Sequence, residues 1–173
     1  MDLAALIRTI PDFPVPGILF RDVTTLINNG PAFREAVDVI SARFAGQHID
    51  KVAAIEARGW IFGAPIAYNL GAGFVPIRKP NKLPAATISC SYELEYGTNS
   101  LEVHCDAIQP GDNVLLIDDL LATGGTARAS INLIERLGGK VVGVGFLIEL
   151  VDLEGRQQLA GYDVESIISF AGA

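Results

Sequence analysis

Short apolar runs alternate with amphipathic segments along most of this chain. The apolar runs predict strands at 52–55, 74–77, 101–105, 113–118, 141–150 and 164–170. The amphipathic segments have apolar side chains at helical spacing, and they predict helices over 3–10, 31–44, 59–70, 127–137 and 153–159. Residues 80–100 show little periodicity, and we expect a long loop there.

The order of these elements predicts an α/β fold in which helices cover both faces of a mainly parallel sheet. Ligands of such sheets bind at the carboxyl ends of the strands. Three loops follow predicted strands at that edge, and they are 56–59, 78–82 and 118–126. We see no internal repeat and no linker, so we expect the 173 residues to form a single domain.

Composition and charge narrow the class of protein. Hydrophobic residues make up 50% of the chain and charged residues 19%, which excludes a disordered protein. No window is long and apolar enough for a membrane span, and the N-terminus lacks the features of a signal peptide, so we expect a cytoplasmic protein. The net charge of −7 argues against nucleic-acid binding. The two cysteines, Cys90 and Cys105, do not have metal-ligand spacing.

The segment after the strand at 113–118 is the most informative about chemistry. Two carboxylates, Asp118 and Asp119, end the apolar run, and Thr-Gly-Gly-Thr follows at 123–126 before the next helix. Glycines let the backbone approach a phosphate, and the free amides of a helix N-terminus point toward the anion. The loop has neither the lysine of a P-loop nor the glycine spacing of a dinucleotide fingerprint. Neutral donors beside two acids indicate a ribose 5-phosphate, with an ordinary βα turn as the alternative.

This segment resembles the signature of the type I phosphoribosyltransferases, in which two acids precede Ala-Thr-Gly-Gly-Thr. The Leu-Leu-Ala at 120–122 resembles that of the adenine-specific members in particular. Other matching segments are Glu-Ala-Arg-Gly at 56–59, the basic run at 78–82, Ser-Tyr-Glu-Leu-Glu-Tyr-Gly at 91–97 and the proline-rich stretch at 12–22. The resemblance therefore extends over nearly the whole chain.

The resemblance implies the type I phosphoribosyltransferase fold, with a small N-terminal hood at about residues 1–30 and a flexible catalytic loop at about 80–100. It assigns binding of the ribose 5-phosphate to Asp118, Asp119, Ala122, Thr123, Gly124, Gly125 and Thr126. It assigns binding of pyrophosphate to Glu56, Ala57, Arg58, Arg78, Lys79 and Lys82. It also implies a cis peptide between Glu56 and Ala57.

The hood and the catalytic loop carry the remaining implied roles. The catalytic residues by resemblance are Glu95, Tyr96 and Arg58. A loop that closes over the reacting groups suits a transition state that water would intercept. An adenine ring would stack between Phe20 and Leu120, and main-chain groups near Leu19 and Arg21 would read its edge. A core position is the alternative for Phe20.

The reaction implied by the resemblance converts adenine and 5-phosphoribosyl 1-pyrophosphate (PRPP) into AMP and pyrophosphate. Mg²⁺ is implied as the cofactor, held mainly by substrate oxygens and water and by no direct protein ligand. Relatives of this kind are homodimers, so a homodimer is expected.

The sequence bears on two alternatives to this reaction, one with a different base as substrate and one without catalysis. A 6-oxopurine substrate would favour a donor such as lysine after the ribose-phosphate loop, where this chain has Arg128 and no lysine before Lys140. A regulator that senses PRPP would need a nucleic-acid surface, which the net charge of −7 disfavours. The Glu95-Tyr96 pair also favours an enzyme.

Overall fold

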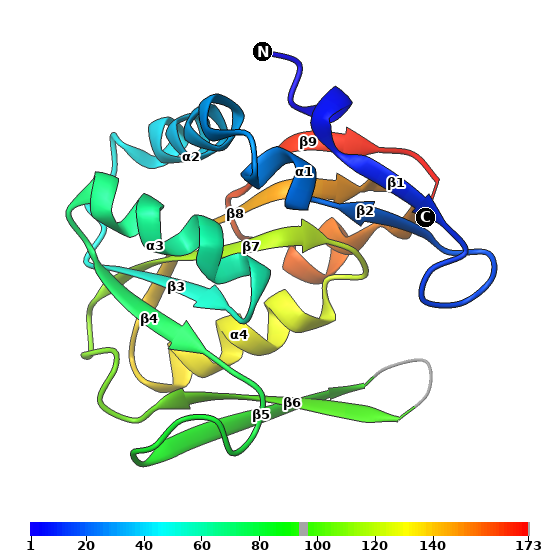
Figure 1. Ribbon diagram of the computed structural model, residues 1–173. Coiled ribbons are helices and arrows are strands. Elements are labelled where there is room, and N and C mark those ends of the chain that lie inside the picture. The colour runs from blue at the N-terminus through cyan, green and yellow to red at the C-terminus, as the bar shows by residue number, and fades with distance from the viewer. Residues whose placement is uncertain (94–96, 173) are drawn as a thin grey trace.

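The computed structural model describes residues 1–93 and 97–172. Its centre is a sheet of five parallel strands in the order β4-β3-β7-β8-β9, flanked on both faces (Figure 1). These strands are β3 (Lys51–Ile55), β4 (Gly73–Ile77), β7 (Asn113–Leu121), β8 (Lys140–Leu150) and β9 (Val164–Phe170). The α-helices are α1 (Thr24–Ile27), α2 (Gly30–Phe44), α3 (Arg58–Leu70) and α4 (Gly125–Arg136). The α/β class and the parallel sheet predicted from the sequence are confirmed.

Side-chain alternation along β7 produces the two layers of the core. Leu115 and Ile117 belong to the core cluster that includes buried side chains of α2 and α3. Val114 and Leu116 belong to the opposite cluster, which includes buried side chains of α4 and of strand β6 (Thr98–His104). Because both faces are covered, the strand reads as a continuous apolar run until it reaches Asp118.

The N-terminal segment differs from the helix predicted over 3–10. Only Ala4–Leu6 form a short 3-10 helix, η1. The next residues form β1 (Arg8–Pro11), which pairs antiparallel with β2 (Leu19–Asp22). Leu3 and Ile7 are buried, so the apolar spacing was correct while the backbone conformation was not. Proline disfavours helical conformation in the residue before it, and Pro11 therefore opposes a helix that reaches residue 10.

The long loop predicted over 80–100 is to a large extent a β-hairpin. Strand β5 (Thr87–Glu93) pairs antiparallel with β6, which begins at Thr98 rather than at residue 101. Ile88, Cys90 and Tyr92 are partly buried against the second core cluster. Their spacing of two residues is the signature of a half-buried strand, and the polar residues between them hid it.

The helix predicted over 153–159 is also different. Two short 3-10 helices, η2 (Val151–Leu153) and η3 (Gly155–Leu159), occupy this stretch. Glu154 lies between them with a φ of 53°, a left-handed conformation that no α-helix contains. No helix among residues 1–93 and 97–172 is long and apolar enough to cross a membrane.

Close packing of α3 on the sheet places the first turn of this helix beside the carboxyl end of β7. A Cβ at Gly63 would lie 2.5 Å from the Cβ of Ala54 in β3, so helix and strand approach each other at contact distance. A Cβ at Gly59 would lie 2.7 Å from Oδ1 of Asp118. The two glycines allow Arg58 to start its helix next to the acids that end β7.

We predict that Gly63→Ala lowers the free energy of unfolding by about 1–3 kcal/mol, because the added methyl group overpacks the contact between α3 and β3. Gly46→Ala is the control, since a Cβ at Gly46 meets nothing within 4 Å. Urea denaturation of both variants measures the difference. Equal changes in the two variants would contradict the close packing of α3 on the sheet.

Candidate active site

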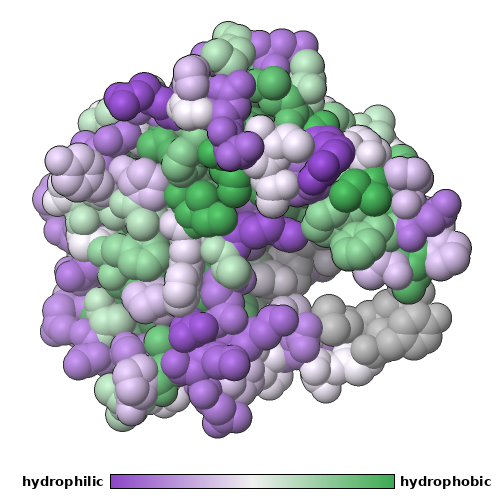
Figure 2. Space-filling model, in the orientation of Figure 1, coloured by the Kyte–Doolittle hydropathy of each residue, from purple (hydrophilic) through white to green (hydrophobic). Residues whose placement is uncertain are grey.

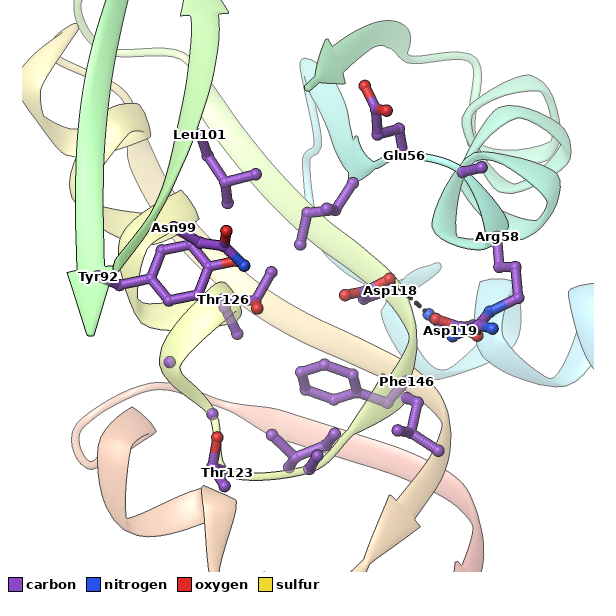
Figure 3. A pocket seen from close by; sticks show the side chains of 18 of the residues that line it. Glu56, Arg58, Tyr92, Asn99, Leu101, Asp118, Asp119, Thr123, Thr126 and Phe146 are labelled. Atoms are coloured by element: carbon purple, nitrogen blue, oxygen red, sulfur yellow. Dashed lines mark hydrogen bonds and ion pairs between the residues drawn. The ribbon is translucent and has the colours of Figure 1, made fainter. Parts of the chain in front are cut away.

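A cleft of about 420 Å³ opens at the carboxyl ends of β3 and β7, below the N-terminal end of α3 and beside the β5–β6 hairpin. Figure 2 shows this face of the molecule hollowed between the main body and the hairpin. Three segments provide most of the lining of the cleft: residues 55–58 at and after the end of β3, residues 118–127 at and after the end of β7, and Tyr92, Asn99 and Leu101 on the hairpin (Figure 3). Lys79 and Phe146 complete it. The position agrees with the strand edge predicted from the sequence.

The turn from β7 into α4, Ala122–Thr126, forms one wall of the cleft, and we call it the glycine loop. All five of its residues line the cleft. Gly124 is the N-cap of α4 and has a φ of 88°, a conformation in which side-chain-bearing residues are strained. The first amide groups of a helix have no partner within the helix, and they are available to an anion in the cleft. The hydroxyls of Thr123 and Thr126 supply two further neutral donors (Figure 3).

The two acids at the end of β7 differ in their surroundings, although both line the cleft. Asp119 is only 6% exposed, and Nε of Arg58 donates a hydrogen bond of 2.5 Å to its Oδ2. Asp118 accepts a 2.9 Å hydrogen bond from the backbone N–H of Asp119. Burial and the neighbouring charge of Asp119 raise the pKa of Asp118 well above its usual value. The pair therefore holds a proton more readily than two separate carboxylates would.

Arg58 connects this acidic pair to the N-terminal hairpin. Its guanidinium carbon lies 5.4 Å from the ring centroid of Phe20 on β2, a cation–π distance. Its side chain remains 45% exposed, so water or a ligand can reach the guanidinium while Asp119 holds it. The Glu56–Ala57 peptide that precedes it is cis, as the resemblance implies, and both residues line the cleft.

The basic residues near residue 80 divide into two groups. Lys79 lines the cleft, whereas Arg78 and Lys82 do not. Nε of Arg78 donates a 2.6 Å hydrogen bond to Glu56, and its guanidinium carbon lies 5.0 Å from the ring centroid of Trp60. Arg78 thus holds the loop after β4 against the loop after β3 in this conformation.

The four residues predicted to bind adenine also divide into two groups, of which one lies at or next to the cleft and the other is turned elsewhere. Leu120 lines the cleft, and Phe20 lies next to it through its contact with Arg58. The Arg21 side chain instead donates to the carbonyl of Gly172 and stacks 4.3 Å from the ring centroid of Phe170. Leu19 lies close to Gly172, where an added Cβ would be 3.8 Å from its Cδ1. Neither Leu19 nor Arg21 lines the cleft in this structure.

Several cleft residues were missed by the sequence interpretation. Tyr92, Asn99 and Leu101 reach the cleft because the stretch assigned to a loop is a hairpin. The period-two pattern through Tyr92 could have revealed the hairpin. Phe146 lies in the middle of the apolar strand β8, and nothing in its sequence context distinguishes it from a core residue. Glu95 and Tyr96, two of the three predicted catalytic residues, lie outside the described residues.

Within residues 1–93 and 97–172, no group of three or more His, Cys, Asp or Glu side chains is placed to hold a metal ion. The acidic residues of the cleft are instead Asp118, Asp119 and Glu56, and two of these are paired with arginines.

Comparison with known proteins gives one consistent result. The phosphoribosyl transferase domain model matches residues 24–170. The chain is 60% identical over 169 residues to the adenine phosphoribosyltransferase of Chloroflexus aurantiacus, with 98% of each chain covered. The adenine phosphoribosyltransferase structure from Thermoanaerobacter pseudethanolicus superposes with a TM-score of 0.95 at 53% identity, covering 98% of each chain. The Saccharomyces cerevisiae enzyme, complexed with an imino-altritol bisphosphate and adenine, gives 0.90 at 36% identity, covering 95% of this chain and 96% of that one.

We predict that Asp118→Asn gains stability relative to the wild type as pH rises. In the unfolded chain Asp118 ionises near pH 3.8, whereas in the folded protein its pKa is raised, so ionisation destabilises the wild type above pH 3.8. Asparagine does not titrate, and its Oδ1 can keep the hydrogen bond from the N–H of Asp119. Urea denaturation of both proteins at several values between about pH 4 and 8 measures the difference. A difference that stays constant, or that favours the wild type at higher pH, would contradict the raised pKa.

Proposed function

This chain belongs to the phosphoribosyltransferase family, and from that premise we propose that it is the member that transfers a phosphoribosyl group to adenine. Adenine and PRPP are converted into AMP and pyrophosphate, a step of purine salvage. High identity over nearly the whole length of relatives named adenine phosphoribosyltransferase supports this assignment. The reaction joins a ring nitrogen of the base to C1 of the ribose as the bond to pyrophosphate breaks.

The observation that carries the proposal is the arrangement of one glycine loop, two acids and one arginine around a single cleft. The glycine loop would bind the 5-phosphate through backbone N–H groups and the hydroxyls of Thr123 and Thr126. Asp118 and Asp119 would accept hydrogen bonds from the ribose hydroxyls. The distribution of donors and acceptors along this wall suits a phosphate next to a diol.

The pyrophosphate would lie on the other side of the cleft, against Glu56, Ala57, Arg58 and Lys79. Arg58 combines three roles in this proposal. It faces the leaving group with an exposed guanidinium, it neutralises Asp119, and it supports the face of Phe20. Arg78 and Lys82 do not line the cleft, and Arg78 would reach the pyrophosphate only after leaving Glu56 and the carbonyl of Lys82.

The base would occupy the part of the cleft between Leu120 and the hairpin that carries Phe20. Main-chain groups of Leu19 and Arg21 would supply one acceptor and one donor to the amino group and ring nitrogen of adenine. Arg128, at the position where a 6-oxopurine site would favour a lysine, donates to the hydroxyl of Tyr162 over 3.5 Å. Arg128 does not line the cleft and offers no donor there to a 6-oxo group, which supports adenine over a 6-oxopurine.

Mg²⁺ is part of the proposal as a cofactor that arrives with the substrate. When bound, it neutralises charge on the pyrophosphate leaving group. The acids of the cleft, Glu56, Asp118 and Asp119, suit an ion held mainly by substrate oxygens and water, and Asp118 and Asp119 would hold second-shell waters. A homodimer remains a prediction of the family resemblance, and a cytoplasmic location remains a prediction from the sequence.

The direct test of the proposed function follows nucleotide formation from PRPP, magnesium and each of adenine, hypoxanthine, guanine and xanthine. We expect AMP from adenine and at most traces of product from the 6-oxopurines. Product from a 6-oxopurine at a comparable rate would contradict the base assignment. Binding of PRPP without product from any base would favour a regulator that senses PRPP.

Glu95 and Tyr96 are proposed to act on the transition state, Glu95 at the base or at the cationic sugar and Tyr96 at the leaving group. We predict that Glu95→Gln lowers kcat by about 10²–10⁴-fold with little change in KM for either substrate, the usual effect of removing a group that acts in proton transfer or charge stabilisation. Glu93→Gln at the exposed end of β5 is a control with the same change of charge. Steady-state kinetics decides, and similar losses in the two variants would contradict a specific role for Glu95.

A further inference from the structure

A charged cluster behind the glycine loop takes no part in the mechanism above. It lies near the carboxyl end of β8, beside the first half of β9, and contains Glu149, Arg156 and Ser166. Nε of Arg156 donates to both carboxylate oxygens of Glu149 over 2.8 and 3.0 Å, and one Nη donates to Oε2 over 2.8 Å. The other Nη donates to the carbonyl of Val164 over 2.7 Å.

The serine completes this arrangement. The hydroxyl of Ser166 donates to Oε2 of Glu149 over 2.6 Å and accepts from Arg156 over 3.0 Å. Glu149 is only 7% exposed, whereas the Arg156 side chain is 46% exposed. Burial alone would raise the pKa of Glu149, but the hydrogen bonds from Arg156 and Ser166 outweigh it and hold that pKa below its usual value. The carboxylate is therefore charged and fully engaged.

The cluster is connected to the glycine loop by two backbone contacts. Arg156 belongs to η3, whose first residue, Gly155, packs on the carbonyl oxygen of Ala122 so closely that a Cβ at Gly155 would collide with it. A Cβ at Gly124 would in turn lie 2.5 Å from the carbonyl oxygen of Gly155 and 3.0 Å from the Cβ of Gln158. η3 is thus the outer wall of the loop, on the side away from the cleft.

Glu149 also approaches the loop from within the sheet. It stands opposite Leu121, the last residue of β7, in the parallel pairing of β7 with β8. The ion pair therefore joins the strand beside the start of the loop to the 3-10 helix that covers its outer side.

We infer that Arg156 and Glu149 are positioning residues for the ribose 5-phosphate site, because their ion pair holds η3 against the backbone of the glycine loop. This inference rests on the proposed function, since it assigns them a role in binding PRPP. Neither side chain lines the cleft, so both act through Gly155 and its contacts with Ala122 and Gly124. When the amides of the loop are held in place before binding, the ligand does not have to order the backbone, and this entropic cost does not weaken its affinity.

The test compares Arg156→Gln and Glu149→Gln with the wild type in steady-state kinetics. We expect KM for PRPP to rise about 10-fold in both variants, the effect of losing one modest positioning interaction, while KM for adenine and kcat at saturating PRPP stay within about 2-fold. A cluster that only stabilises the fold would lower the melting temperature and the active fraction without this selective change.

The two variants also distinguish an effect of positioning on KM for PRPP from an electrostatic effect of the lost charge. Arg156→Gln removes a positive charge and Glu149→Gln a negative one, so a purely electrostatic effect on an anionic substrate would move KM for PRPP in opposite directions. Positioning moves it in the same direction. Arg43→Gln is the matched control, because Arg43 forms an exposed 3.2 Å ion pair with Glu165, near the start of β9. This variant should leave KM for PRPP unchanged.

Removal of Arg156 leaves a buried carboxylate without its partner, and that variant is the one at risk of not folding. Glu149→Gln leaves only a half-exposed arginine and then decides the test, supported by Ser166→Ala, which removes a single member of the cluster. Unchanged KM for PRPP in the folded variants, or opposite shifts in the two, would overturn the inference. Absence of AMP formation by the wild type would contradict the proposed function instead.

Discussion

A Cβ atom at Gly124 would lie 2.5 Å from the carbonyl oxygen of Gly155, and the site depends on the absence of that atom. The missing side chain lets the chain turn from β7 into α4 with a left-handed residue while η3 closes behind the turn. Gly125 and Thr126, the first residues of α4, line the cleft. The close contact is made possible by glycine on both sides, since Gly155 has equally little room beside Ala122.

This constraint explains how a chain of net charge −7 can bind a substrate that carries several phosphates. The wall of the cleft next to the acids relies on backbone amides and hydroxyls, whose donor character does not depend on net charge. The principal cation, Arg58, is already partly neutralised by Asp119. Burial and the neighbouring charge of Asp119 raise the pKa of Asp118, so this position opposes a second negative charge beside Asp119. The site thus limits repulsion locally instead of depending on a basic surface.

Much of this arrangement could be predicted from the sequence, because the succession of strands and helices along the chain and the glycine loop follow from local patterns. The apolar run 113–118 ended in acids, and the Thr-Gly-Gly-Thr that follows marked the anion site without any knowledge of the tertiary structure. Three elements were misassigned for physical reasons. The helix predicted over 153–159 is instead two 3-10 helices separated by the left-handed Glu154. The β5–β6 hairpin has one polar face, so its period of two was hidden among small and polar residues. The N-terminal helix was replaced by a strand, because pairing with β2 outweighed the helical spacing of its apolar residues.

Other features depend on contacts between residues distant in sequence, and no local pattern contains them. Phe146 enters the cleft only because β8 lies beside β7, and Arg78 turns to Glu56 and Trp60 because two strand ends are adjacent. The packing of η3 behind the glycine loop belongs to the same class. These long-range contacts determine how firmly the loop is held, whereas the sequence motif determines only its chemistry.

The most direct measurement is the affinity of Gly124→Ala for PRPP by isothermal titration calorimetry, compared with Gly111→Ala. Both glycines have a φ near 90°, 88° for Gly124 and 90° for Gly111, so both variants carry the same backbone strain. An added Cβ meets Gly155 at the first position and nothing within 4 Å at the second. We expect binding of PRPP to weaken by at least about 10-fold in Gly124→Ala only, equivalent to about 1.4 kcal/mol. Equal affinities of the two folded variants would contradict the claim that the closely packed glycine loop binds the phosphate.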